Sequence, residues 1–383
     1  MSVPIYLDNQ ATTRCDPRVL ERMLPYFTEH YGNAASKTHS FGWMAEAAVD
    51  LAREQVASSI GGNASEVTFC SGATEANNLA LRGTAEAYAG RGKHIVVAAT
   101  EHASVLDCAR ALETAGWELS LVPVGVDGRV RVEDVVAVLR ETTTVVSIML
   151  VNNETGVIAD IAALSEAIHG AYPKAAVHCD AVQALGKIPI DVSALGVDLL
   201  TISAHKAYGP KGVGALWRRR RPRLVVQPQI LGGGHESGLR SGTLPVPLLV
   251  GFGVACELAD AERDAESLRL GILRDLLLEG LKREVGGITV NGSTEFRIAS
   301  NLNIAIDGVT ADVLLSETRD VAMSTGSACS SASAKASHVL AAMVSPARAR
   351  SSIRLGLGRF TTEDEVTRAL AHLAAGIRAV RGA

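Results

Sequence analysis

The chain has 383 residues, of which 47% are hydrophobic, 20% charged and 4% aromatic, and its net charge is −4. At roughly 150 residues per domain, this length predicts two or three domains of an ordinary globular protein. The slightly acidic balance and the scarcity of aromatic residues argue against nucleic acid as a partner. No apolar run reaches the roughly 18 residues of a membrane span. We therefore expect no direct nucleic acid binding and no contact with a membrane.

The cysteines are widely spaced. None forms a C-x-x-C pair, which argues against a zinc ribbon or a thioredoxin-type motif, so no metal site is expected. The N-terminus lacks a basic region followed by an apolar stretch, so we expect no export signal, a cytoplasmic location and reduced thiols. A lone cysteine that acts as a nucleophile is the possibility left open.

From about residue 65 to 217, short β-branched runs alternate with helical patterns. The expected strands are Val67–Cys70, His94–Ala98, Leu119–Val124, Thr144–Leu150, Ala176–Cys179, Leu199–Ile202 and Gly214–Leu216. The expected helices are Thr74–Ala89, Ser104–Ala115, Val132–Leu139 and Ile161–Tyr172. This alternation predicts an α/β fold with a mostly parallel, buried sheet that helices cover on both faces.

The pattern changes towards the C-terminus. Residues 248–286 predict one long amphipathic helix, Ile288–Val290 and Asn301–Ile306 predict strands, and Glu363–Arg381 predicts a closing helix. We therefore expect a large α/β domain over residues 14–260. A smaller α+β domain is expected to comprise residues 1–13 and 261–383.

Two strand ends carry groups that suit pyridoxal 5'-phosphate (PLP). Ser203-Ala-His-Lys206 follows one apolar run, and His178-Cys-Asp180 ends another. Ligands of open α/β sheets bind outside the carboxyl ends of the strands. PLP needs a Schiff-base lysine and an acidic partner for its pyridinium nitrogen, which Lys206 and Asp180 can provide. The structural alternatives are an exposed loop lysine and a helix N-cap.

Two further segments lie between a predicted strand and a predicted helix. Ser71-Gly-Ala-Thr74 precedes a helix whose free N–H groups can bind a phosphate, with the Thr74 hydroxyl adding a donor. Helix capping alone gives the same pattern. His102 in Thr100-Glu-His102 follows the strand His94–Ala98, where a lone histidine is more often structural.

Cys329 lies in a run of Ser, Ala, Gly and Thr over residues 324–333, which predicts a mobile loop with an exposed thiol. Such a thiol suits a nucleophile or a sulfur carrier, and an inert small residue is the alternative. Arg354 stands in an apolar, glycine-punctuated segment, so it implies a carboxylate partner from the protein or a substrate. The basic run 218–223 predicts a solvated loop. The glycine-rich segment 232–238 resembles a phosphate cradle but lacks a strand–turn–helix context.

In this order the motifs are specific, and the sequence resembles the NifS/IscS-like cysteine desulfurases over essentially the whole chain. The matching segments are YLDNQATT (6–13), GNAAS (32–36), SGATEANN (71–78), TEH (100–102), VNNETG (151–156), HCDAVQALGK (178–187), SAHKAYGPKG (203–212), GGGHESGLRSGTLP (232–245), GSACSSAS (326–333) and SSIRLGLGRFTTEDEV (351–366). The resemblance implies the fold type I aminotransferase architecture, PLP as the cofactor, and a homodimer with active sites at the subunit interface.

The resemblance also implies roles in holding PLP. Lys206 would carry the cofactor as a Schiff base, Asp180 would pair with the pyridinium nitrogen, and His102 would stack on the ring and assist proton transfer. The residues implied to hydrogen-bond the ring substituents are Gln183 and Asn153. Those implied to bind the phosphate are Ala73, Thr74, Ser203, His205 and, from the neighbouring subunit, Thr243.

For the substrate, the resemblance implies that Arg354, helped by Asn33, clamps the carboxylate of L-cysteine. Cys329 would then attack the substrate sulfur, releasing L-alanine and leaving a persulfide for a sulfur-acceptor protein, either a scaffold or a dedicated carrier. Three departures from the family pattern are Ala34, Val182 and a chain that stops soon after Arg381. Relatives often continue with a tail that helps to dock the iron–sulfur scaffold, so we expect weak scaffold binding and a dedicated acceptor.

Two alternatives stay open at this point. One is a selenocysteine lyase or another PLP lyase of the same fold, in which Cys329 is dispensable. The other is a sulfur-relay or scaffold component with weak catalysis, which has no need of Lys206, Asp180 and His102. The sequence also leaves the pathway open between iron–sulfur cluster assembly and the thiolation of tRNA, DNA or a metabolite.

Overall fold

The computed structural model describes residues 3–326 and 337–382. Its largest sheet has seven strands in the order β2-β8-β7-β6-β5-β3-β4. Their bounds are β2 Val67–Cys70, β3 His94–Ala98, β4 Glu118–Val122, β5 Thr143–Ser147, β6 Ala176–Asp180, β7 Leu199–Ser203 and β8 Gly214–Arg218. The strands β3 to β7 pair in parallel, and only β8 within this sheet runs antiparallel to its neighbours β7 and β2. The predicted mostly parallel sheet is confirmed.

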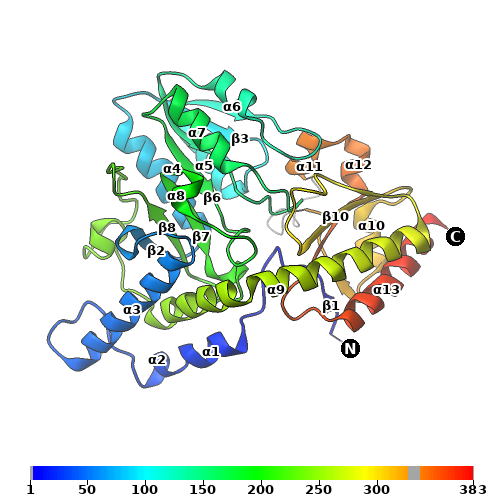
Figure 1. Cartoon of the computed structure of the whole chain (residues 1–383), viewed down its shortest axis with the longest axis horizontal. Helices are drawn as coiled ribbons and strands as arrows, with labels where there is room; N and C mark the ends of the chain where they lie inside the picture. The colour runs from blue at the N-terminus through cyan, green and yellow to red at the C-terminus, as the bar shows by residue number, and fades with distance from the viewer. Residues whose placement is uncertain (1–2, 327–336, 383) are drawn as a thin grey trace.

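Helices cover both faces of this sheet, as the alternating pattern predicted (Figure 1). They include α3 Ser40–Ser58, α4 Ala73–Tyr88, α5 Ala103–Thr114, α6 Val132–Val138, α7 Ile161–Ala171 and the single turn α8 Val192–Leu195. Successive side chains of β3 point to opposite faces, because Val96 packs in the core shared with α3 and α7, whereas Ile95 and Val97 pack in the core shared with α4 and α5.

The long helix predicted near 248–286 is α9, Val246–Val285, with 40 residues. Its first part packs along α3 and contributes Leu249, Phe252 and Cys256 to the core of the large sheet. Its last part contributes Leu270 and Leu277 to a second core. In Figure 1 α9 crosses the whole molecule. The boundary near residue 260 stays a prediction, because α9 runs through that position as a continuous helix.

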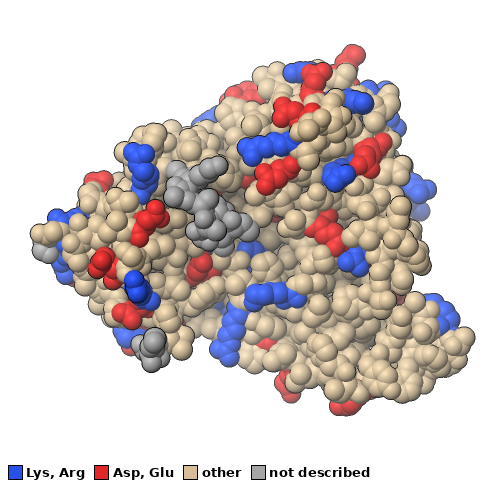
Figure 2. Space-filling view, turned by 180° about the vertical axis from the view of Figure 1, so that it is seen from behind, with Lys and Arg blue, Asp and Glu red and all other residues tan. Residues whose placement is uncertain are grey.

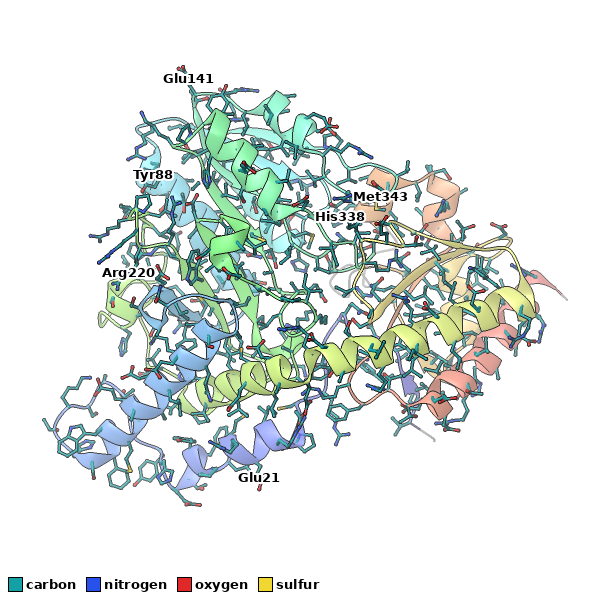
Figure 3. The ribbon with its side chains drawn as sticks, viewed as in Figure 1. Glu21, Tyr88, Glu141, Arg220, His338 and Met343 are labelled. Atoms are coloured by element: carbon teal, nitrogen blue, oxygen red, sulfur yellow. The ribbon has the colours of Figure 1, made fainter. Side chains whose placement is uncertain are left out.

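The second core lies around an antiparallel sheet of order β12-β10-β9. Its strands are β9 Ile288–Val290, β10 Asn301–Ile306 and β12 Ser352–Gly356, and a separate pair joins β1 Ile5–Tyr6 to β11 Val321–Ala322. The surrounding helices are α10 Ala311–Glu317, α11 His338–Met343, α12 Pro346–Arg350 and α13 Glu363–Arg381. Figure 3 places His338 and Met343 on α11, and Nε2 of His338 lies 2.9 Å from the backbone carbonyl of Glu101, in the connection between β3 and α5.

Two short helices, α1 Pro17–Met23 and α2 Pro25–Thr28, precede α3, and none of these three helices was predicted. The basic run 218–223 was predicted as a solvated loop, and this is wrong for its beginning. Arg218 is the last residue of β8, and Arg219 forms a 2.5 Å ion pair with the buried Asp198. Only the later arginines of the run are exposed, because the strand continues further than its apolar residues suggest.

Charges of both signs are scattered over the face seen in Figure 2, which shows no large field of one sign. Among the helices that the structure describes, none is both long and apolar enough to cross a membrane.

Candidate active site

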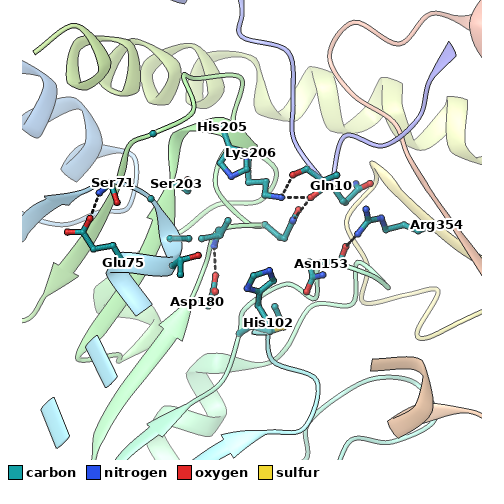
Figure 4. Close-up of a pocket in the computed structure, with 18 residues that line it drawn as sticks. Gln10, Ser71, Glu75, His102, Asn153, Asp180, Ser203, His205, Lys206 and Arg354 are labelled. Atoms are coloured by element: carbon teal, nitrogen blue, oxygen red, sulfur yellow. Dashed lines mark hydrogen bonds between the residues drawn. The ribbon is translucent and has the colours of Figure 1, made fainter. Parts of the chain in front are cut away.

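A cavity of about 270 Å³ lies at the carboxyl ends of β6 and β7 (Figure 4). It brings together most of the site residues predicted from the sequence. Those that line it are Ala73, Thr74, His102, Asn153, Asp180, Gln183, Ser203, His205, Lys206 and Arg354. They come from both the large sheet and the small one, so the cavity lies where the two cores meet.

Lys206 ends a single 3-10 turn, Ala204–Lys206, directly after the buried strand β7. Its Nζ donates hydrogen bonds to the backbone carbonyls of Gln10, at 2.5 Å, and Ala11, at 2.6 Å. The Gln10 carbonyl also accepts a 2.9 Å hydrogen bond from Nε2 of Gln183. The N-terminal segment therefore orients two of the predicted cofactor residues at once, and Lys206 is not the exposed loop lysine of the structural alternative.

Asp180 is the last residue of β6 and is only 4% exposed. Its Oδ1 accepts a 3.0 Å hydrogen bond from the Val182 amide, and its Oδ2 accepts one of 2.8 Å from Nδ2 of Asn77. A turn follows Asp180 instead of the helix that an N-cap would require. Its carboxylate, held by two donors, is thus presented to the cavity from the strand end.

His102 lines the cavity and is also the N-cap of α5, so it has a structural contact as well as a place in the cavity wall. Its Nδ1 accepts a 3.1 Å hydrogen bond from the Ser104 amide. Burial lowers the pKa of His102, and the nearby Lys206 and His338 side chains also act to lower it, while Asp180 acts to raise it. The neutral imidazole is therefore the favoured form in this site.

The neighbouring Glu101 is fully buried. Burial raises the pKa of its carboxyl well above the usual value, and the nearby Asp180 carboxylate raises it further. Its Oε1 accepts a 2.5 Å hydrogen bond from the Met149 amide. Burial and the Asp180 carboxylate thus both favour the uncharged form of Glu101.

The start of α4 forms the wall of the cavity opposite the small sheet. Ala73 and Thr74 are its first residues, and Gly72 before them has φ 156°, a conformation open to glycine. The first N–H groups of a helix have no partner within the helix and can bind an anion. Nearby, burial and Lys206 lower the pKa of His205 to about 4, so its ring is neutral, and its Nδ1 lies 3.1 Å from the Thr12 hydroxyl.

Arg354 reaches the cavity from β12 and is 1% exposed. The carboxylate partner predicted for it is Asp8, at 2.6 Å from Nη2, and Nη1 donates to the Asn153 carbonyl at 3.0 Å. Arg354 Nε and Asn153 Oδ1 are both buried and lack a hydrogen-bond partner in the described structure. One donor and one acceptor in residues that line the cavity are thus without a partner among the described residues.

Two predicted residues lie outside this cavity. Asn33 and Thr243 are exposed, and Asn33 lines a separate hollow together with Arg53 and Glu236. Glu236 in turn forms a 2.6 Å ion pair with Arg53 and accepts a hydrogen bond from the Phe69 amide, which fastens the glycine-rich segment to β2. This segment ends in a single turn, Glu236–Gly238, and does not form a phosphate cradle of the strand–turn–helix kind.

Cys329 lies outside the described residues. The residues described on either side of its segment are attached to the cavity wall. Ser324 donates a 2.9 Å hydrogen bond to Asp8, next to Arg354, and Ser337 donates to the Glu154 carboxylate.

Asp8, Gln10, Asn77 and Ser104 contact the predicted site residues but had no role assigned from the sequence. Asp8, Gln10 and Asn77 lie within segments that already matched the family motifs, so that match was the available signal. Among residues 3–326 and 337–382, no group of three or more His, Cys, Asp or Glu side chains is placed to hold a metal ion.

Comparison with known proteins gives the same family. Residues 5–369 match the class-V aminotransferase family. The chain belongs to this family. It is 53% identical, over 100% of its length and 94% of the relative's, to the cysteine desulfurase IscS of Anaeromyxobacter dehalogenans (strain 2CP-C).

Solved structures show the same fold. A NifS-like protein is 35% identical with a TM-score of 0.91, covering 97% of this chain and 99% of its own. SspA, solved in complex with cysteine, is 32% identical with a TM-score of 0.81, covering 93% of this chain and 99% of its own. The predicted fold type I architecture and the resemblance to the cysteine desulfurases are confirmed.

Proposed function

We propose that the chain is a PLP-dependent cysteine desulfurase, which converts L-cysteine to L-alanine and retains the sulfur as a persulfide on Cys329. The observation that carries the proposal is the convergence of Lys206, Asp180 and His102 on one cavity from the ends of β7 and β6 and the start of α5 (Figure 4). The names of the similar proteins support the same activity.

The residues that line the cavity fit PLP. Lys206 would hold it, Asp180 would face its pyridinium nitrogen, and the first turn of α4 would receive its phosphate beside Ser203 and His205. The unpartnered Asn153 Oδ1 supports a polar ligand at this place. When bound, PLP supplies an electron sink that weakens the bonds to the substrate's α-carbon.

The chain's own residues then bind the substrate and move its protons. Arg354 receives the α-carboxylate through the guanidinium edge that Asp8 and Asn153 leave open. Lys206, the amine that follows β7 and lines the cavity, would serve as the base for the proton of the α-carbon. Gln183, whose Nε2 donates to the Gln10 carbonyl, contributes a polar side chain to the cavity wall beside Lys206.

The thiol that receives sulfur is Cys329. Of the six cysteines, the five in the described residues all have a thiol pKa raised chiefly by burial, which lowers their thiolate fraction: Cys15, Cys70, Cys108, Cys179 and Cys256. The Cys329 thiolate attacks the substrate sulfur, an S–S bond forms as the C–S bond breaks, and the released carbon takes a proton. Cysteine and thiol thus give alanine and persulfide, with atoms and electrons balanced.

We further propose a homodimer, in which Asn33 and Thr243 reach the cavity of the partner. Its support is the exposed apolar surface of the N-terminal helices, which comprises Leu20, Leu24, Phe27, Tyr31, Phe41, Trp43 and Met44. Large apolar side chains that stay exposed in one part of a soluble protein are a mark of interaction sites. Asn33 and Thr243 do not line the cavity of their own chain, so a role for them at the site would require a second subunit.

The test is to incubate the PLP-loaded protein with L-cysteine and a thiol reductant and to measure sulfide and alanine. We expect both products in equal amounts, and neither from Lys206→Ala. Turnover of selenocysteine without turnover of cysteine would instead establish the lyase alternative. Absence of both activities in a protein that retains PLP would refute the proposal.

The sulfur acceptor and the cytoplasmic location stay predictions. We propose that the acceptor is a protein that receives the persulfide from Cys329, for iron–sulfur cluster assembly or for thiolation of another product. Isolating the persulfidated enzyme with its bound partner identifies that protein.

A further inference from the structure

A chain of hydrogen bonds links two of the site's polar groups behind the cavity wall. Nδ2 of Asn77, on α4, donates to Oδ2 of Asp180 at 2.8 Å and to Oγ of Ser104 at 2.9 Å. Oγ of Ser104, on α5, lies 2.9 Å from Nδ1 of His102. Asn77 is fully buried and Ser104 partly so. Neither side chain lines the cavity, so both act on it through Asp180 and His102.

The Asp180 carboxylate at one end determines which group donates in each hydrogen bond between Asp180 and His102. An ionised carboxylate only accepts hydrogen bonds, so Asn77 must turn its amide nitrogen, not its oxygen, towards Asp180. The same nitrogen then donates to Ser104 Oγ. Because that oxygen accepts from Asn77, its own proton is free to point at His102 Nδ1. The Asn77 Oδ1, buried without a hydrogen-bond partner in the described structure, shows that the amide is held by its donors alone.

His102 Nδ1 therefore receives two donors, the Ser104 hydroxyl and the Ser104 amide at 3.1 Å. A nitrogen that accepts hydrogen bonds carries no proton, so the proton of the neutral ring lies on Nε2. A proton on Nδ1, in the other tautomer or in the imidazolium, would face the backbone N–H of Ser104. Both forms are thereby disfavoured.

We propose that Asn77 and Ser104 are positioning residues that hold His102 as the neutral Nε2–H tautomer. In the resting site His102 is then a hydrogen-bond donor towards the cavity and not a base. Proton abstraction falls to Lys206, as the proposed function requires. The tautomer does not itself depend on that function, because it follows from contacts within the chain.

The charges around His102 agree with this assignment. The groups that act on it are Asp180 on β6, Lys206 after β7, His338 on α11 and Asp107 on α5. Burial of the ring, Lys206 and His338 all disfavour a positive charge on His102. The carboxylates of Asp180 and Asp107 favour that charge. The Asp180 carboxylate already accepts hydrogen bonds from Asn77 and Val182.

The test uses protein labelled with ¹⁵N at histidine only and loaded with cofactor but without substrate. Long-range ¹H–¹⁵N correlation spectra distinguish the two neutral tautomers and the imidazolium by the shifts of the ring nitrogens. The signals of His102 are assigned as those lost in His102→Gln. We expect the Nε2–H pattern at pH 7 in the parent protein.

Two matched variants separate positioning from simple folding effects. Ser104→Ala removes the hydroxyl donor to Nδ1. The population of the Nδ1-protonated forms relative to the Nε2–H form should therefore rise about fivefold, which is the effect of losing one ordinary hydrogen bond. Ser104→Thr keeps the hydroxyl and should restore the parent pattern. Asn77→Leu should shift the same equilibrium in the same direction by a smaller factor, because Ser104 then loses the donor that orients it.

An Nδ1–H or imidazolium pattern in the parent at pH 7 would overturn the proposal, and so would identical tautomer ratios in Ser104→Ala and Ser104→Thr. Because no substrate is present, these outcomes are independent of whether L-cysteine yields sulfide. A failure of the proposed function leaves the tautomer result interpretable, and a failure of the tautomer assignment leaves the activity assay interpretable.

Discussion

Arg354 and Asp8 form a 2.6 Å ion pair at one end of the cavity, although 346 residues separate them in the sequence. The pair joins β12 to the segment that follows β1. It holds one edge of the guanidinium and leaves Nε without a partner in the described structure. A bound carboxylate therefore meets an arginine whose orientation is already set, which lowers the entropy lost on binding.

Arg354→Lys should weaken substrate binding more than cofactor retention. Lysine keeps the charge but presents a single ammonium, so it cannot serve Asp8 and a carboxylate in the planar geometry of arginine. Loss of one charge-assisted hydrogen bond predicts a rise in KM of about ten- to hundredfold. Steady-state kinetics and PLP content measure the two effects. Arg368→Lys, at an exposed position on α13, is the control, and an equal loss of PLP would show that Arg354 has a structural role.

Borohydride reduction of the yellow, PLP-loaded protein should attach the cofactor to Lys206. Lys187 is the credible competitor, because burial and the nearby Lys206 lower its pKa to about 7 and leave much of its amine neutral. Its Nζ, however, donates to Gln183 Oε1 at 3.1 Å, and it does not line the cavity. Peptide mapping by mass spectrometry identifies the site. A labelled peptide containing Lys187 or Lys211 would refute the assignment.

Cys329→Ala should retain PLP and bind L-cysteine, since Lys206, Asp180 and Arg354 are unchanged. Its rate of sulfur release should fall to about one hundredth of the parent rate or lower, because the variant lacks the nucleophile that accepts the sulfur. Cys15→Ala is the matched control, because Cys15 is the least buried of the described cysteines. If Cys329→Ala turned over L-cysteine at the parent rate, the persulfide step would be wrong and the lyase alternative would gain support.

The pH dependence of stability should contain a contribution from Lys187. Its pKa is about 7 in the folded chain and near 10.5 when unfolded, so the unfolded state binds more protons between these values. The unfolding free energy should therefore rise with pH across this window, by up to about 1 kcal/mol per pH unit, and fall as the pH drops towards 7.

Lys187→Met removes this contribution, so the parent should gain stability relative to the variant as the pH rises from 7 to 10. Urea unfolding of both proteins at each pH gives the difference, in which the contributions of cysteine and tyrosine cancel. Lys174→Met, at an exposed lysine, should show no such trend. Parallel curves for Lys187→Met and the parent would contradict the prediction.

The sequence alone predicts the strands of the large sheet well, because each is a short β-branched run between helical patterns. β2, β3, β9 and β10 have the predicted bounds, and so does α13. The short helices α1 and α2 were missed, since 7 and 4 residues are too few to show a helical period. The helix α3, with 19 residues, was also missed, because its buried face consists mainly of alanines, which mark an apolar period only weakly. The strand β12, which carries Arg354, was not predicted as a strand.

The site residues at strand ends were predictable for a topological reason. Parallel strands place their carboxyl ends at one edge, so Asp180 and Lys206 had to lie near each other. The contacts of Asp8 with Arg354 and of Asn77 with Ser104 depend on how separate elements pack. No local pattern in the sequence encodes such distances. The predicted role of Thr243 involves a second subunit, so one chain cannot test it. Asn33 was predicted to act beside Arg354, and it lies at a separate hollow of its own chain.

The continuous helix α9 has a consequence for which substrates the cavity can accept. At 1.5 Å per residue its 40 residues form a spine about 60 Å long, to which both the Lys206 wall and the Arg354 wall are attached. The continuous helix thus fixes the distance between the Lys206 amine and the Arg354 guanidinium. This distance selects molecules by the spacing of their amino and carboxyl groups. One residue inserted between Cys256 and Leu270 would turn the second half of the helix by about 100° and destroy that setting.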